Sequence, residues 1–270
     1  MKLFIYSSLA LALFSTACSS SEKTTQTSKV KQTGIPLAPE IFSSKIERVL
    51  TNSEGQDSTV SSIEYDFYSM PKSAFQDSVN HFIGNFIDAT SAMESEGYQY
   101  ETLTHQYFYH VLSQFEENFK SVRNASESQG VWFYQANVKI DDQLANYAQV
   151  KCDAAFYTGG AHPNTSISNA VISKENGTKL TLSDLTTDVL KFNKIAEKYF
   201  RLERELSKTA DLKADFWFEN GVFVCNDNFY INDEGITFTF NAYEVAPYYF
   251  GPTEFTVPLN EVSSILKIKI

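Results

Sequence analysis

Apolar and polar residues alternate in the first structured part of the chain. From Val60 to Tyr68 the large apolar side chains occupy every second position, with Glu64 and Asp66 between them. A period of two predicts a strand with one buried face. The apolar run from Ile46 to Leu50 predicts a partner strand, and the polar segment from Asn52 to Gly55 predicts the turn that joins the two.

The period then changes to that of helices. Pro71 suits the first position of a helix, and the residues after it place an apolar stripe on one face: Phe75, Val79, Phe82, Ile83, Phe86 and Ile87. A second stripe follows after Gly97: Tyr100, Leu103, Tyr107, Phe108, Val111, Leu112, Phe115 and Phe119. We expect these two helices to form an αα-hairpin that packs on the sheet.

A period of two returns at Val131. Residues 131–140, 145–157 and 166–173 are predicted to be strands, the first two antiparallel, and Cys152 lies on the apolar face of the middle one. The stripe from Leu190 to Leu206 predicts a helix with Asp188 as its N-cap.

The remaining residues again favour strands. We expect these at 221–225, 229–231, 236–240 and 254–257, with an aromatic loop at 246–252 and a helical turn at 260–266. The order of elements predicts an α+β fold, in which antiparallel sheets carry helices packed on one face. We expect two small α+β units, at residues 40–135 and 136–270.

The N-terminus indicates where the protein works. Lys2, an apolar run to Phe14 and the small residues up to Ala17 have the order of a secretory signal, so residues 1–17 are predicted to be removed. Cys18 directly afterwards resembles the bacterial lipobox, which implies an acylated Cys18, membrane attachment and an envelope location, with Ser19 compatible with the outer membrane. The alternative is an ordinary signal peptide followed by an unrelated cysteine. Residues 18–39 are polar and predict a lipidated flexible tether.

The charge of the mature chain limits its partners. Removal of residues 1–17 takes away one of the 22 basic residues, so 21 remain against 33 acidic residues, a net charge of −12. This balance argues against nucleic acid as a partner, because nucleic acid requires a basic surface. It permits a cationic partner, although acidity also serves solubility alone.

Two cysteines remain besides Cys18. Cys152 and Cys225 could form a disulfide in an oxidising compartment, or they could be buried free thiols. The sequence leaves both alternatives open. Neither lies in a CxxC motif, so neither a redox site nor a zinc site is indicated.

Two segments carry a family resemblance. The first is Tyr157-Thr158-Gly159-Gly160-Ala161-His162-Pro163-Asn164, and the second runs through Tyr243-Glu244-Val245-Ala246-Pro247-Tyr248 and Gly251 to Val257-Pro258-Leu259. Together they resemble the RsiV-type extracellular domain family, and residues 40–135 are similar to the small domain that precedes PdaC-type peptidoglycan deacetylases. The resemblance implies an envelope protein that recognises lysozyme or cell wall. It brings no catalytic residue, because the deacetylase domain is absent from this sequence.

Candidate binding residues follow from the same segments. Gly159 and Gly160 permit a tight turn, and Tyr157 and His162 beside it form either a recognition edge or a hydrogen-bonded structural turn. Tyr248, Tyr249 and Phe250 form an aromatic loop, which either contacts a ligand or caps the core.

No catalytic motif accompanies these residues. The four histidines form no HExxH, and no GxSxG is present, so we expect neither catalysis nor a metal or cofactor. The first functional hypothesis is therefore a non-catalytic, lipid-anchored binder of a lysozyme-like protein, acting as inhibitor or sensor. The alternatives are a module that binds peptidoglycan or another glycan and, third, a cell-wall hydrolase.

Overall fold

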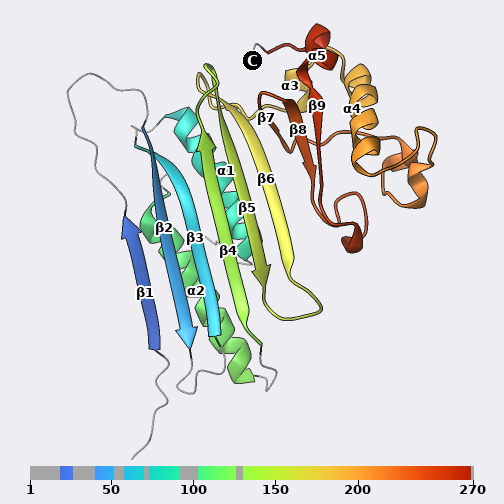
Figure 1. Ribbon diagram of the computed structural model, residues 1–270. Helices are drawn as coiled ribbons and strands as arrows, with labels where there is room; N and C mark the ends of the chain where they lie inside the picture. Colours follow the sequence, from blue (N-terminus) through green and yellow to red (C-terminus); the bar gives the residue numbers. More distant parts are fainter. Residues whose placement is uncertain are drawn as a thin grey trace, which may run out of the picture.

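A six-stranded sheet forms the larger part of the molecule (Figure 1), and its strands lie in chain order. They are β1 (Ser19–Gln26), β2 (Glu40–Thr51), β3 (Ser58–Ser69), β4 (Trp132–Asp141), β5 (Tyr147–Tyr157) and β6 (Asn164–Ser173). The computed structural model describes residues 19–26, 40–51, 58–69, 73–91, 103–125 and 130–268. The predicted turn at 52–55, Pro71 and Tyr100 lie outside these residues.

One pair of neighbours in this sheet is parallel. All others are antiparallel, whereas β3 and β4 run in the same direction. The chain between them contains α1 (Ala74–Ser91) and α2 (His105–Ala125). A parallel connection needs a long crossover, which the two helices supply. The expected antiparallel sheet is therefore confirmed except at this one pair, which is parallel.

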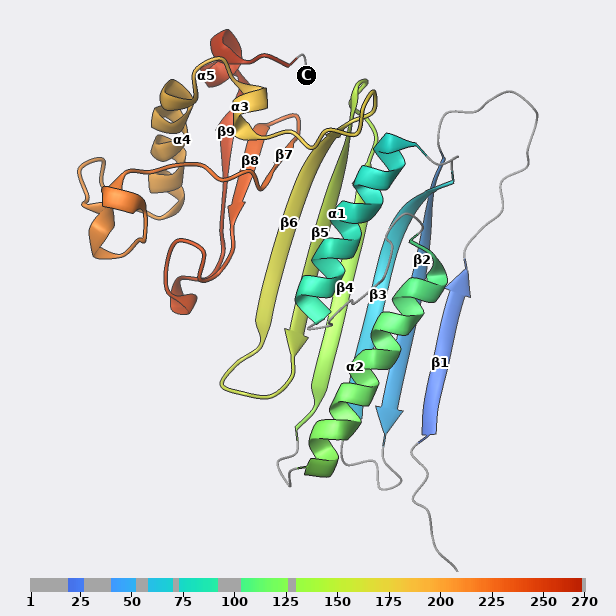
Figure 2. The ribbon, with the colours of Figure 1, turned by 180° about the vertical axis from the view of Figure 1, so that it is seen from behind.

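Both helices cover the same face of the sheet (Figure 2). Ser73 caps α1, since its Oγ accepts a hydrogen bond from the backbone N–H of Gln76 at 3.2 Å. Most described residues of the predicted stripes are buried against the strands, whereas Phe82 and Leu103 are half-buried; the largest side chains in this core are Tyr107, Phe108, Phe115 and Tyr134. The two helices contact each other through Tyr107, whose hydroxyl donates to Asp88 Oδ1 at 2.8 Å.

The second unit is built around a three-stranded antiparallel sheet of β7 (Phe229–Ile231), β8 (Gly235–Phe240) and β9 (Thr253–Pro258). The helix α4 (Val189–Glu203) packs on it, and Asp188 caps α4 by accepting from the N–H of Lys191 at 2.9 Å, as predicted. A second hydrophobic core contains many phenylalanines, among them Phe192, Phe200, Phe229 and Phe238.

Short helical segments complete the second unit. They are α3 (Leu182–Leu185), η2 (Leu212–Ala214), η3 (Glu219–Gly221), η4 (Tyr248–Phe250), α5 (Leu259–Val262) and η5 (Ser263–Ile265). The α+β architecture with two cores agrees with the predicted fold class.

Three details differ from the sequence expectations. Ser19–Gln26, placed in a flexible tether, pairs with β2 through its backbone as an edge strand. Residues 221–225 form no strand: Asn220 and Gly221 have φ angles of 55° and 71°, which turn the chain away from a ladder. Finally, β4 continues the sheet across the expected boundary between residues 135 and 136.

Candidate functional site

The predicted glycine turn lies in the loop between β5 and β6. Gly159 and Gly160 have φ angles of 93° and 107°, which a residue with a side chain rarely adopts. A Cβ at Gly160 would meet no atom within 4 Å, so the backbone angle and not space requires glycine there. Tyr157 closes the turn, because its hydroxyl donates to the Gly160 carbonyl at 2.9 Å.

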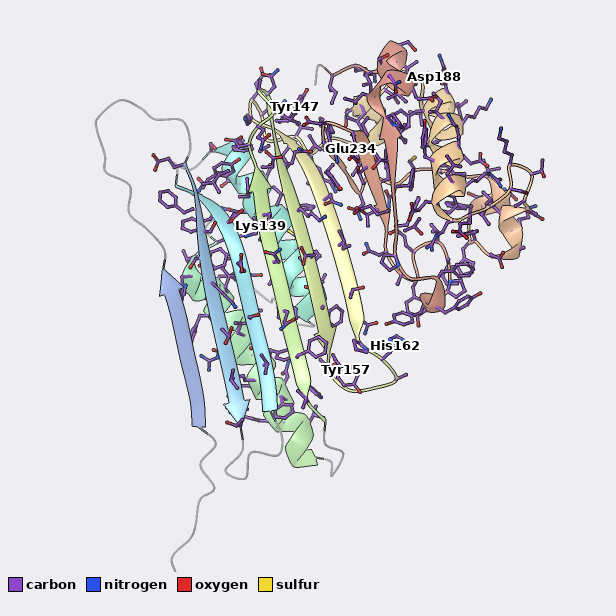
Figure 3. The ribbon with its side chains drawn as sticks, viewed as in Figure 1. Lys139, Tyr147, Tyr157, His162, Asp188 and Glu234 are labelled. Atoms are coloured by element: carbon purple, nitrogen blue, oxygen red, sulfur yellow. The ribbon has the colours of Figure 1, made fainter. Side chains whose placement is uncertain are left out.

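His162 connects this loop to the second unit. Its ring stacks on the ring of Tyr248, with centroids 3.6 Å apart and 16° between the planes. Its Nδ1 lies 2.9 Å from the Pro163 carbonyl oxygen, and the Tyr248 hydroxyl donates to the same oxygen at 2.7 Å. The two predicted candidate segments, distant in sequence, therefore meet in space (Figure 3 labels Tyr157 and His162).

Tyr243 joins the same group. Its hydroxyl lies 3.5 Å from His162 Nε2, and its ring centroid lies 5.5 Å from that of Tyr248. Tyr243 has a φ angle of 66°, a strained conformation for a bulky residue, and it is 54% exposed. It was not among the predicted site residues, although it begins the tail segment that carries the family resemblance.

The aromatic loop divides into an inner and an outer part. Phe250 packs on Phe216 in the second core, and its carbonyl accepts from Arg204 Nη1 at 3.0 Å. Tyr249, in contrast, is 78% exposed. Phe250 thus has the structural role, and Tyr249 remains available for contact. We call His162, Tyr243, Tyr248 and Tyr249 the junction cluster.

Side-chain amides hold the two units together along the length of β5 and β6. The Gln149 amide bonds both backbone groups of Ile231 in β7, at 2.6 and 2.8 Å. Two asparagine side chains bond the backbone along the outer edge of β6. Asn241 accepts from the N–H of Ile167 and donates to its carbonyl. Asn228 accepts from the N–H of Asn169 and also donates to the Ile167 carbonyl. These amides satisfy backbone groups that an edge strand would otherwise leave unpaired. The bonds of Asn241 to Ile167 therefore attach the segment that carries Tyr243 to β6.

The two remaining cysteines are free thiols. Cys152 lies in the first core and Cys225 in the second, so the disulfide alternative is wrong for this fold. Burial raises the pKa of both thiols well above the usual range, which keeps them protonated.

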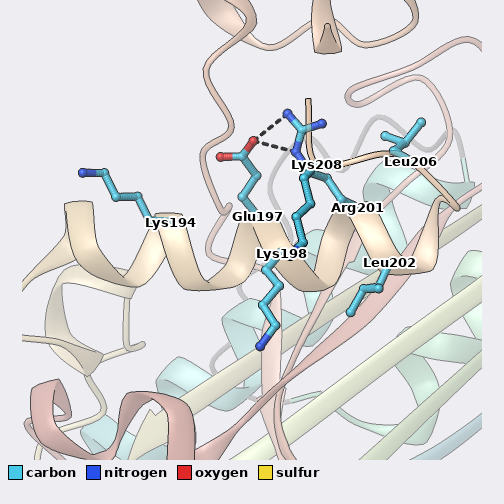
Figure 4. A pocket seen from close by; sticks show the side chains of 7 residues that line it. All are labelled: Lys194, Glu197, Lys198, Arg201, Leu202, Leu206 and Lys208. Atoms are coloured by element: carbon cyan, nitrogen blue, oxygen red, sulfur yellow. Dashed lines mark hydrogen bonds and ion pairs between the residues drawn. The ribbon is translucent and has the colours of Figure 1, made fainter. Parts of the chain in front are cut away.

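Grooves also lie elsewhere on the surface of the described residues. One runs along α4 and has a volume of about 400 Å³ (Figure 4). Two of its four cations form ion pairs: Arg201 pairs with Glu197 at 2.7 Å, and Lys198 pairs with Glu261 at 3.0 Å. Another, of about 520 Å³, lies on the face of the six-stranded sheet that α1 and α2 leave uncovered.

Other predicted features lie outside what the structure describes or have no counterpart in it. Cys18 and residues 1–17 are not among the described residues. Within the described ranges, no helix is long and apolar enough to cross a membrane. In the same part of the chain, no three His, Cys, Asp or Glu side chains come together as a metal site would require.

Comparison with known proteins identifies a domain without an assigned function. Residues 183–260 match the family described as "Protein of unknown function (DUF3298)". The chain is similar in structure to a DUF3298 family member from Bacteroides fragilis, with a TM-score of 0.60 and 20% identity over 86% of this chain and 94% of that one. It is also similar to a DUF3298 family protein from Pseudomonas aeruginosa, with a TM-score of 0.55 and 18% identity over 86% and 95%. No curated protein matches it.

These likenesses extend over both units and confirm the α+β fold. Residues 183–260 are thus similar to the DUF3298 family, and the two solved structures share the fold over 86% of this chain. The narrower resemblance to RsiV-type domains stays a prediction.

Proposed function

We propose that this protein is a non-catalytic, lipid-anchored protein of the bacterial envelope that recognises a lysozyme-like protein, as an inhibitor or sensor. The observation that carries the proposal is the convergence of the two family segments in the junction cluster. His162 and Tyr248 come from loops 86 residues apart, yet their rings stack at 3.6 Å. Both segments with the resemblance therefore contribute to one surface.

The junction cluster has the properties of a protein-binding hot spot. Tyrosine is enriched at such positions, because a rigid aromatic side chain buries a large area at little cost in conformational entropy. Tyr249 and Tyr243 are 78% and 54% exposed. Tyr248 is held by its hydrogen bond to the Pro163 carbonyl and by its stack on His162, and its ring packs against that of Tyr243. A partner would thus meet Tyr243 on a base of Tyr248 and His162, and Tyr249 on Phe250.

The charge of the chain suits a cationic partner. A net charge of −11 on the full sequence, or −12 after removal of residues 1–17, attracts positively charged proteins over long range. Such attraction mainly accelerates association and is screened by salt, whereas buried aromatic contacts persist. The proposal therefore predicts binding that weakens with salt without disappearing.

The test is calorimetry of the 19–270 chain, which contains both cores, with a c-type lysozyme. Tyr249→Ala and Tyr243→Ala are each expected to weaken binding tenfold or more, or about 1.4 kcal/mol. Leu190→Ala is the matched control, because Leu190 on α4 is 76% exposed but lies outside the junction cluster. Equal affinity of the tyrosine variants and the control would refute the assignment of this surface.

Membrane attachment has its own test. Cells that express the full chain are labelled with an alkyne analogue of a fatty acid, and the protein is examined for the label. We expect labelling that Cys18→Ser abolishes. A labelled Cys18→Ser variant, or an unlabelled parent chain, would contradict the anchor and leave the binding proposal intact.

A further inference from the structure

We propose that the groove along α4 binds an acidic peptide segment of a partner protein, in which carboxylates flank apolar side chains. The groove has a volume of about 400 Å³ and lies on the second unit (Figure 4). None of its lining residues belongs to the junction cluster. The proposal is independent of lysozyme recognition, because it concerns a partner of the opposite charge.

One side of the groove is the exposed face of α4. Lys194, Lys198 and Leu202 are spaced four residues apart, so they form one row along the helix. Glu197 and Arg201 have the same spacing and form the neighbouring row. The first row is about 12 Å long. This length matches about three or four residues of an extended peptide.

The segment that follows α4 forms the other side of the groove, and Arg201 holds it in place. The Nη1 of Arg201 donates to the carbonyls of Ser207 and Ala210, both at 3.0 Å. Its Nε donates to Glu197 at 2.8 Å, and the whole side chain is only 13% exposed. The segment is therefore fixed against the helix. A groove that exists before the ligand arrives saves the cost of ordering it on binding.

The groove offers apolar surface as well as charge. Leu202 is 63% exposed on α4, and Leu206 is half-buried where it packs on the second core. The methylene stems of the lysines add further apolar area between their charged ends. An apolar side chain of a ligand that lies in the groove would remove Leu202 from water, which favours binding.

The charge of the groove is opposite to that of the chain. Its lining has four cations, Lys194, Lys198, Arg201 and Lys208, and one carboxylate, Glu197. The ion pairs described above engage Lys198 and Arg201. Lys194 and Lys208 form no ion pair within the part of the chain that the structure describes. Two uncompensated cations thus flank apolar surface on a protein of net charge −11, and carboxylates of a ligand would complement them.

Two other occupants fit the structure less well. A membrane would have to reach α4, but β1, which begins one residue after the proposed anchor at Cys18, starts at the lower end of the six-stranded sheet in Figure 1. The helix α4 lies beside the upper end, away from the anchor. A second copy of this chain would also carry a net charge of −11, which opposes association.

The experiment measures fluorescence anisotropy of three labelled synthetic peptides of equal length with the 19–270 chain. The first peptide consists of glutamate and leucine, the second has serine in place of leucine, and the third has lysine in place of glutamate. We expect the first to bind, the second to bind about fivefold more weakly and the third to show no binding. Binding of the first peptide should weaken as salt is added, because exposed lysines attract it.

Charge reversal in the groove provides the decisive variant. Lys194→Glu with Lys208→Glu should weaken binding of the first peptide about tenfold or more, and Leu202→Ser about fivefold. Lys191→Glu with Lys213→Glu is the matched control. It changes the net charge by the same amount at exposed residues outside the groove, and it should bind like the parent chain. Thermal unfolding of both double variants should match that of the parent chain, since all four lysines are exposed.

Three results would overturn the proposal. The first is absence of binding by the glutamate–leucine peptide, or an equal loss in the groove variant and the control, which would mean charge attraction alone. The second is binding of phosphatidylglycerol vesicles, but not of the peptide, that the groove variant loses. The third is a dimer in analytical ultracentrifugation that the groove variant abolishes, which would assign the groove to a second copy. The groove variant should bind lysozyme like the parent chain, so failure of this site and failure of the lysozyme proposal are distinguishable.

Discussion

A buried ion pair between β2 and α2 provides a sharp test of how the first core is held. Arg48 donates to Glu116 through two bonds, Nε to Oε1 at 2.8 Å and Nη2 to Oε2 at 2.9 Å. The side chains are only 9% and 2% exposed, and the guanidinium lies 4.6 Å from the centroid of the Tyr109 ring. The hydrogen bonds that Arg48 donates to Glu116 raise the pKa of Arg48 above its ordinary value, so the arginine stays charged.

Removal of one partner should therefore be costly. Glu116→Ala leaves a buried cation without its carboxylate, which typically destabilises a protein by about 3–5 kcal/mol. For a chain of this size, that corresponds to a fall in melting temperature of about 6–20 °C. Replacement of both partners by apolar residues, Arg48→Met with Glu116→Leu, removes the charge together with its desolvation cost. We expect this double variant to be at least as stable as the parent chain.

Tryptophan fluorescence can follow the unfolding of the first core in this measurement. Trp132 packs on Phe115 and Phe119 in the first unit, whereas Trp217, the second of the two tryptophans, is 56% exposed in the second. In a Trp217→Phe background, urea unfolding followed by fluorescence reports on the first core alone. The reasoning fails if Glu116→Ala costs less than about 1 kcal/mol, or if the double variant is less stable than Glu116→Ala.

Three further predictions concern the junction and the thiols. Tyr248→Phe deletes one hydrogen bond and keeps the stack on His162, so thermal unfolding should show a loss of about 0.5–1.5 kcal/mol. Gln149→Ala leaves both backbone groups of a buried β7 residue unpaired, and we expect a loss of about 2 kcal/mol or more together with faster hydrogen exchange in β7. Burial raises the pKa of Cys152 and Cys225, so a thiol reagent should modify neither cysteine in the folded chain. After unfolding in the absence of reductant, the reagent should modify both. An unfolded chain that does not react would instead indicate a disulfide.

Local pattern was enough to predict most of the elements. The stripes of α1 and α2, the alternation in β3 to β6 and the Asp188 cap all depend on residues close in sequence, and the structure confirms them. The segment 221–225 shows the limit of this reasoning. Phe223 and Cys225 are buried and Val222 and Val224 exposed, as in a strand, but the segment pairs with no other strand; the N–H of Cys225 instead donates to the side chain of Asn193.

The candidate site was predictable only in parts. The sequence indicated the glycine turn and the aromatic loop, but their contact depends on packing between two units and has no local signal. Tyr243 was missed because a single exposed tyrosine beside a turn resembles any other surface residue, and its φ angle of 66° is visible only in the structure. The amide bonds of Gln149 and Asn228 were missed for the same reason, since their partners lie about 60 to 80 residues away.

The measurement that most directly tests the central claim is calorimetry of the 19–270 chain and its Tyr249→Ala variant with a c-type lysozyme, side by side at physiological salt. The account predicts measurable heat for the parent chain and binding at least tenfold weaker for the variant. No heat for the parent chain, or heat seen only at low salt and unchanged by Tyr249→Ala, would mean charge attraction alone and would contradict recognition through the junction cluster.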